Sequence, residues 1–170
     1  MTHPISPITA TVKFADPIDS DFEKPTGPMQ RNRLSAKVTT SNAPLTLDIR
    51  DIRTSKTVAV DLQLTTRNYF EETRVTIGPT FECNFAASSK LSKVNVKDGV
   101  TLPQNDPTGA NRPRVLKIYK GEANSVEGSV SYETQPSAAT STNSGISRPY
   151  IQGSLTLENT MSPIYLNFAP

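Results

Sequence analysis

Hydrophobic and polar residues alternate with a period of two in many short stretches of this chain. The longest such stretch covers 57–85, and it opens with Val58, Val60, Leu62 and Leu64 alternating with polar or small residues. This period is typical of a β-strand with one buried face. The same pattern predicts shorter strands at 8–14, 34–40, 45–49, 74–77, 81–85, 94–96, 100–102, 115–119, 128–132, 151–157 and 164–168.

The residues between these stretches predict turns. Asp98-Gly99 lies between two alternating runs and is typical of a type I′ hairpin, because both central residues of that turn need a positive φ. The segment 41–44 predicts a short hairpin-type connection, and 86–91 predicts a single helical turn at most. We therefore expect an all-β fold: an antiparallel β-sandwich, or a jelly-roll or barrel-like domain, with extended N- and C-terminal arms and long polar loops.

The chain length of 170 residues suits one domain. Its 14 prolines and its hydrophobic content of 35% indicate that much of the chain lies in loops or arms. We expect an N-terminal arm and first strand over 1–16, followed by a single all-β domain over 17–170. Two polar segments of that domain, near 103–113 and 134–149, predict flexible loops.

Few residues suit catalysis or metal binding. The chain has one histidine, His3, and one cysteine, Cys83, which excludes a zinc site built from His and Cys and makes a catalytic triad implausible. Cys83 shares the face of Phe81 and Phe85 in its alternating run, which predicts a core position. Acidic pairs for glycoside hydrolysis exist in the central stretch, at Asp61, Glu71, Glu72 and Glu82. The chain has no Trp and few aromatic residues to stack on a sugar, which argues against a glycosidase. Taken with the histidine and cysteine counts, this leads us to expect no enzyme, no cofactor and no metal.

Basic residues supply two weak candidates for contact with nucleic acid. The net charge of +2 is too small to attract a polyanion by itself. Two local groups could still touch phosphate, although lysines and arginines on strands more often fill the solvent side. The first group is Arg31, Arg33 and Lys37, and the second is Arg112, Arg114 and Lys117.

The sequence also gives an expectation for localisation. It holds no apolar stretch of about 18 residues and no charged start followed by an apolar segment. We expect a protein made in the host cytoplasm that contacts no membrane and ends in a virion. The alternative is the cell surface, if a leader has been removed.

Two N-terminal stretches, PITATVKFADP and RNRLSAKV, resemble the start of some small RNA-phage coat proteins, whose C-terminal helices have no counterpart here. No binding residue follows from this resemblance. An all-β chain with strand-like ends, long polar loops and little catalytic chemistry is typical of proteins that work by contact.

We therefore expect a structural protein of a virus or phage particle: a coat, a decoration (cement) protein or a tail component. Its partners would be copies of itself and other shell or fibre proteins. The terminal strands supply the expected assembly contacts, Ile8, Val12, Phe14, Ile164, Leu166 and Phe168. One alternative is a pilus, fimbrial or adhesin subunit that assembles by β-strand addition, and a further one is a carbohydrate-binding β-sandwich.

Overall fold

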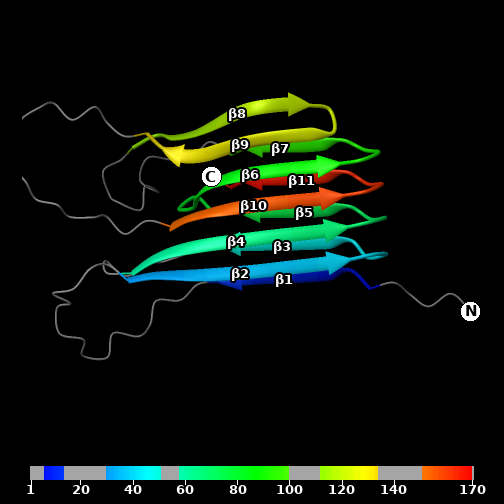
Figure 1. Cartoon of the computed structure of the whole chain (residues 1–170), viewed down its shortest axis with the longest axis horizontal. Coiled ribbons are helices and arrows are strands. Elements are labelled where there is room, and N and C mark those ends of the chain that lie inside the picture. The colour runs from blue at the N-terminus through cyan, green and yellow to red at the C-terminus, as the bar shows by residue number, and fades with distance from the viewer. Residues whose placement is uncertain (1–5, 14–29, 51–57, 100–111, 134–150, 170) are drawn as a thin grey trace, which may run out of the picture.

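The computed structural model describes residues 6–13, 30–50, 58–99, 112–133 and 151–169. These residues form eleven β-strands and contain no helix, so the all-β prediction is confirmed. They accordingly include no helix that could cross a membrane. Figure 1 shows the strands stacked as two layers with closely parallel axes.

The first layer is a five-stranded sheet in which all neighbours run parallel. In spatial order its strands are β1 (Ile8–Lys13), β3 (Leu45–Arg50), β5 (Thr73–Ile77), β11 (Ile164–Phe168) and β7 (Val94–Asp98).

The second layer is a six-stranded sheet. Its first four strands are parallel, and the last two form an antiparallel hairpin on its edge. In spatial order they are β2 (Gln30–Thr40), β4 (Val58–Asn68), β10 (Ile151–Asn159), β6 (Glu82–Ser89), β9 (Ser125–Tyr132) and β8 (Arg114–Glu122). The prediction of an antiparallel sandwich is therefore wrong for most of the strand pairs and right only for β6, β9 and β8.

The parallel pairing follows from how the strands are connected. Four times, a strand of the six-stranded sheet turns into a strand of the other sheet: β2 into β3, β4 into β5, β6 into β7, and β10 into β11. Such a connection is a β-arch, and stacked arches place equivalent strands parallel. The predicted hairpin at 41–44 is one of these arches, and the predicted helical turn at 86–91 is mostly strand β6.

The arches do not stack in chain order. β10 and β11, the last strands of the chain, lie in the middle of their sheets between β4 and β6 and between β5 and β7. Figure 1 shows this as an orange and a red strand flanked by green ones. The C-terminal arch therefore joins the two earlier parts of the stack.

The core lies between the sheets, where the alternating apolar residues of both layers meet. Val75, Ile77, Leu157 and Leu166 are completely buried, and Cys83 is buried as predicted. The phenyl rings of Phe85 and Phe168 pack at 5.4 Å between centroids. Burial of these apolar surfaces is the main stabilising contribution to the fold.

Several predicted features fall partly or wholly outside the described residues. The predicted N-terminal arm contains β1, which pairs with β3 at the sheet edge. Residues 100–102, the second half of the predicted Asp98-Gly99 hairpin, lie outside the described part, as do 134–149 and most of 103–113.

Candidate functional site at the arch turns

The four arch turns gather at one end of the sandwich. Each turn has four residues, and we call 41–44, 69–72, 160–163 and 90–93, in spatial order, the arch turns. Their backbones bond to one another as the strands do: Phe70 N donates to Ser41 O at 3.1 Å, Met161 N to Tyr69 O at 3.0 Å, and Leu91 N to Thr160 O at 3.0 Å. The turns therefore form a continuous, regularly spaced surface.

A buried polar residue precedes each turn. These residues, Thr40, Asn68, Asn159 and Ser89, are neighbours in the strand register and form what we call the polar ladder. All are at most 5% exposed.

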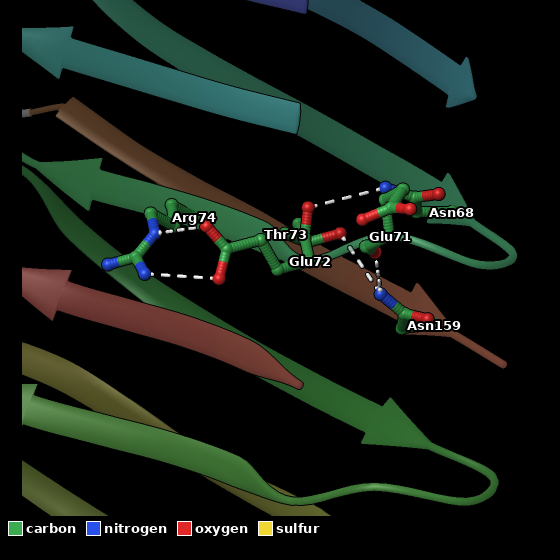
Figure 2. Close-up of polar contacts among 6 residues, drawn as sticks. All are labelled: Asn68, Glu71, Glu72, Thr73, Arg74 and Asn159. Atoms are coloured by element: carbon green, nitrogen blue, oxygen red, sulfur yellow. Dashed lines mark hydrogen bonds and ion pairs between the residues drawn. The ribbon is translucent and has the colours of Figure 1, made fainter. Parts of the chain in front are cut away.

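The polar ladder runs in one direction along the stack. Asn68 Nδ2 donates to the carbonyl of Ala43 at 3.1 Å, Asn159 Nδ2 to the carbonyl of Glu71 at 2.7 Å, and Ser89 Oγ to the carbonyl of Ser162 at 3.1 Å. Each of these side chains thus reaches the third residue of the preceding turn. Figure 2 shows the amide of Asn159 directed at Glu71 and Thr73, and the amide of Asn68 donating to its second acceptor, the carbonyl of Glu72, at 3.3 Å. Because the buried amide and hydroxyl groups of the ladder need acceptors, the ladder fixes how each turn lies on the next.

Two side chains on β5 and its turn form an ion pair that holds the second turn. Arg74 donates to both carboxylate oxygens of Glu72, from Nε at 2.8 Å and from Nη2 at 3.0 Å (Figure 2). This hydrogen bonding lowers the pKa of Glu72 from its ordinary value. The Arg74 guanidinium also lies 4.5 Å from the centre of the Tyr165 ring, so it ties neighbouring strands β5 and β11 together.

Three of the four arch turns carry a large apolar side chain that is exposed. The second residue of three successive turns is a large exposed side chain: Phe70 at 52%, Met161 at 48% and Leu91 at 71%. We call these three residues the apolar ridge. Tyr69, beside it, is 38% exposed. Exposed apolar residues that cluster rather than scatter are typical of contact surfaces.

Charge is distributed unevenly along the apolar ridge. Glu71 lies next to Phe70 and is exposed, whereas Lys90 and Lys93 flank Leu91 at the other end and are also exposed. The turn of Met161 between them, 160–163, has no charged residue. One end of the ridge is therefore acidic and the other basic.

The predicted assembly contacts have different environments. Ile164, Leu166 and Phe168 are 0–1% exposed and belong to the chain's own core. Ile8 is 42% exposed on edge strand β1. The side chain of Val12 and all of Phe14 lie outside the described part.

The predicted basic groups lie at opposite edges of the six-stranded sheet, on or beside β2 and β8. On β2, Arg33 and Lys37 are exposed, and the Arg33 Nε lies 3.7 Å from the Asp61 carboxylate. The side chain of Arg31 is outside the described part, and Lys117 on β8 is exposed.

Arg112 and Arg114, beside and on β8, are engaged with the protein itself. The Arg112 guanidinium lies 3.8 Å from the Glu82 carboxylate, and both side chains are only 14% exposed. Arg114 donates to the carbonyls of Ala169, Gly78 and Phe81 at 3.0–3.4 Å, and its burial lowers its pKa. These contacts clamp the C-terminal strand to the turn before β6.

The chain's single cysteine, Cys83, is buried in the core. Burial raises the pKa of the Cys83 thiol to about 12, so it stays protonated near neutral pH. Among the described residues, no group of His, Cys, Asp and Glu is arranged to hold a metal ion. Comparison with protein-family models, with curated proteins and with solved structures finds no match to this chain.

Sequence reasoning missed both the polar ladder and the apolar ridge. Their signal is a repeated spacing: a polar residue, four turn residues and the first core residue of the next strand, as in Asn68 to Thr73 and Asn159 to Ile164. The ridge residue is always the second of the four.

Proposed function

We propose that this protein is a non-enzymatic structural subunit of a virus or phage particle, and that it pairs with a second copy through the arch turns. The observation that supports this proposal best is the apolar ridge, Phe70, Met161 and Leu91. The particle itself is an expectation from the sequence, from its extended polar segments and strand-like ends.

The charges beside the ridge favour a two-fold contact. A two-fold axis through Met161 would bring Phe70 of one copy against Leu91 of the other. The same rotation would set Glu71 opposite Lys90 and Lys93. Interfaces with this symmetry must be self-complementary, and a ridge that is acidic at one end and basic at the other meets that condition.

The test is self-association measured by sedimentation. Replacing the three ridge residues by serine, as Phe70→Ser with Met161→Ser and Leu91→Ser, should weaken association about tenfold or more, because apolar anchors dominate such contacts. The matched control is Ile118→Ser with Tyr119→Ser on β8, which removes side chains that are 46% and 68% exposed on another surface. Equal association of both variants and the parent protein would contradict the proposal.

The charges allow a second arm of the same experiment. Glu71→Lys should weaken association by placing like charges together, and adding Lys90→Glu should restore it. Unchanged association in the single variant would exclude the two-fold arrangement even if the ridge is required. If the serine variant also failed to assemble into particles, pairing through the arch turns would be a step of particle assembly.

The second candidate function is a pilus, fimbrial or adhesin subunit that assembles by strand addition. It is favoured by the edge formed by β1 and β2, each of which pairs with only one strand among the described residues.

A further inference from the structure

The stack of arches ends at β1 and β2 in an incomplete repeat. In three of the four arches, the residue that follows the turn donates its backbone N–H to the fourth turn residue of the next arch: Leu45 to Glu72, Thr73 to Pro163 and Ile164 to Lys93. Ile8 N donates to Pro44 O at 2.9 Å in the same way. β1 therefore occupies the position that the second strand of one more arch would have at this end of the stack.

The sequence before β1 agrees with this assignment. A proline directly precedes the first residue of β1, β3 and β11: Pro7 before Ile8, Pro44 before Leu45 and Pro163 before Ile164. Ser6-Pro7-Ile8 also repeats Ser162-Pro163-Ile164. In a complete arch the first strand would pair with the outer edge of β2. No described strand occupies that position.

Side chains at this edge are exposed where their equivalents are buried. Ile8 is 42% exposed, whereas Leu45 and Ile164, at the same place in their arches, are 0% exposed. Leu34 on β2 is 39% exposed, whereas Leu62, its partner on β4, is 3% exposed. These differences are the apolar surface that one more strand would begin to cover.

The β2 edge is also suited to backbone pairing. β2 keeps a continuous register with β4 over eleven residues, from Gln30–Val58 to Thr40–Asn68. By contrast β8, the opposite edge of the sheet, has a register shift between Ile118 and Lys120. Bulges protect an edge from added strands, and β2 has no such shift.

Charge defines the partner. Arg33 and Lys37 lie on the solvent face of β2, four residues apart, and are exposed. A second copy pairing through its own β2 would bring two strands together that have basic residues and no acidic one. The β8 edge of a second copy presents exposed Lys117 and Lys120, and its exposed Glu122 already lies 3.7 Å from Lys120. Like charges directly opposite one another are destabilising.

We propose that the outer edge of β2 accepts an extended segment of a different polypeptide, in which apolar residues alternate with acidic ones. The apolar residues lie over Leu34 and Ile8, and the acidic residues face Arg33 and Lys37. Main-chain hydrogen bonds to β2 supply affinity, as in other cases of strand addition. This site is separate from the arch turns and does not depend on the contact proposed there.

The experiment measures fluorescence anisotropy of labelled peptides as long as β10, in which valine alternates with glutamate or, in the control peptide, with lysine. The glutamate peptide should bind at least about tenfold more tightly. Hydrogen exchange should slow in β2 on binding, which separates strand addition from general charge attraction. Equal binding of both peptides, or no slowing in β2, would overturn the proposal.

Matched variants locate the site. Lys37→Glu and Leu34→Glu should each weaken glutamate-peptide binding about tenfold or more, whereas Lys117→Glu and Ile118→Glu on β8 should not. Lys37→Glu replaces an exposed side chain and keeps the test valid if Leu34→Glu does not fold. The serine variant of the apolar ridge should bind the peptide normally. Dimerisation of the parent protein through β2, seen as slowed hydrogen exchange in β2 without any peptide, would instead identify a second copy as the occupant and overturn the proposed partner.

Discussion

Single residues decide how well the arches stack, and the polar members of the core differ in how they are satisfied. Asn159 uses its whole amide: Nδ2 donates to Glu71 O at 2.7 Å, and Oδ1 accepts from the backbone N–H groups of Met161 at 3.2 Å and Ser162 at 3.1 Å. Thr66, on the neighbouring strand β4, is completely buried, and its Oγ1 has no hydrogen-bond partner. An unpaired hydroxyl in the core lowers stability, whereas a paired amide fixes the turn.

Thr66→Val should therefore stabilise the protein by about 1 kcal/mol, because valine has nearly the shape of threonine and no hydroxyl to desolvate. Urea unfolding would measure the change. Thr73→Val is the matched control, since Thr73 is equally buried but its Oγ1 accepts from Asn159 Nδ2 at 3.4 Å. A loss of stability in Thr66→Val would show that the hydroxyl of Thr66 is satisfied. An equal gain in Thr73→Val would show that the gain does not come from removing an unpaired hydroxyl.

At the scale of elements, close packing of strands depends on two glycines that lie beneath phenyl rings. A Cβ at Gly153 of β10 would lie 2.7 Å from Phe81 Cζ and would also meet the carbonyl of Leu62 on β4. A Cβ at Gly128 of β9 would lie 2.7 Å from Phe85 Cζ. Both glycines let a ring fill the space over a strand.

Gly153→Ala should accordingly destabilise the protein by about 2 kcal/mol, since neither the backbone of β4 nor the buried ring of Phe81 can move away freely. Thermal unfolding would detect this as a lower midpoint. Gly121→Ala is the control, because its Cβ would lie 3.4 Å from Ile118 Cγ2, an ordinary contact. Equal stability of Gly153→Ala and the parent protein would mean that β10 and β4 can separate at little cost.

The sequence predicted the elements better than their pairing. Alternation located the strands and their buried faces, as in β4, where Leu62 and Leu64 are buried. It could not show the direction of the neighbours, because a half-buried strand has the same period of two in parallel and antiparallel sheets. The polarity of the outer faces pointed to antiparallel pairing, since parallel sheets are usually covered on both sides.

The sequence did not reveal the arch turns, because the connection between two strands looks alike in different folds. A four-residue connection such as 41–44 can be a hairpin loop or an arch turn, and its composition alone does not separate the two. The charge of Arg114 made it a weak candidate for phosphate contact, whereas its guanidinium donates to three backbone carbonyls. Those carbonyls belong to Gly78, Phe81 and Ala169, which are far apart in the sequence and meet only in the folded chain.

At the scale of the whole molecule, the chain order and the spatial order conflict. β10 pairs with β4 and with β6, and β11 pairs with β5 and with β7. Residues 151–168 therefore provide the only direct strand pairing, among the described residues, between the part of the stack formed by β1 to β5 and the part formed by β6 to β9. Contacts between residues this far apart in the sequence form late and slow folding.

A chain ending at residue 133 should therefore fail to fold, because both halves would expose core residues and the unpaired edges of β4, β5, β6 and β7. Loss of a cooperative thermal transition and of dispersed amide resonances would show this, and adding a peptide of residues 151–170 should restore both by filling the gap. Deleting residues 1–13 is the control, because it removes β1, an edge strand with a single neighbour, and should leave a folded protein. A cooperatively folded chain of residues 1–133 would show instead that the two halves meet directly, without the C-terminal arch between them.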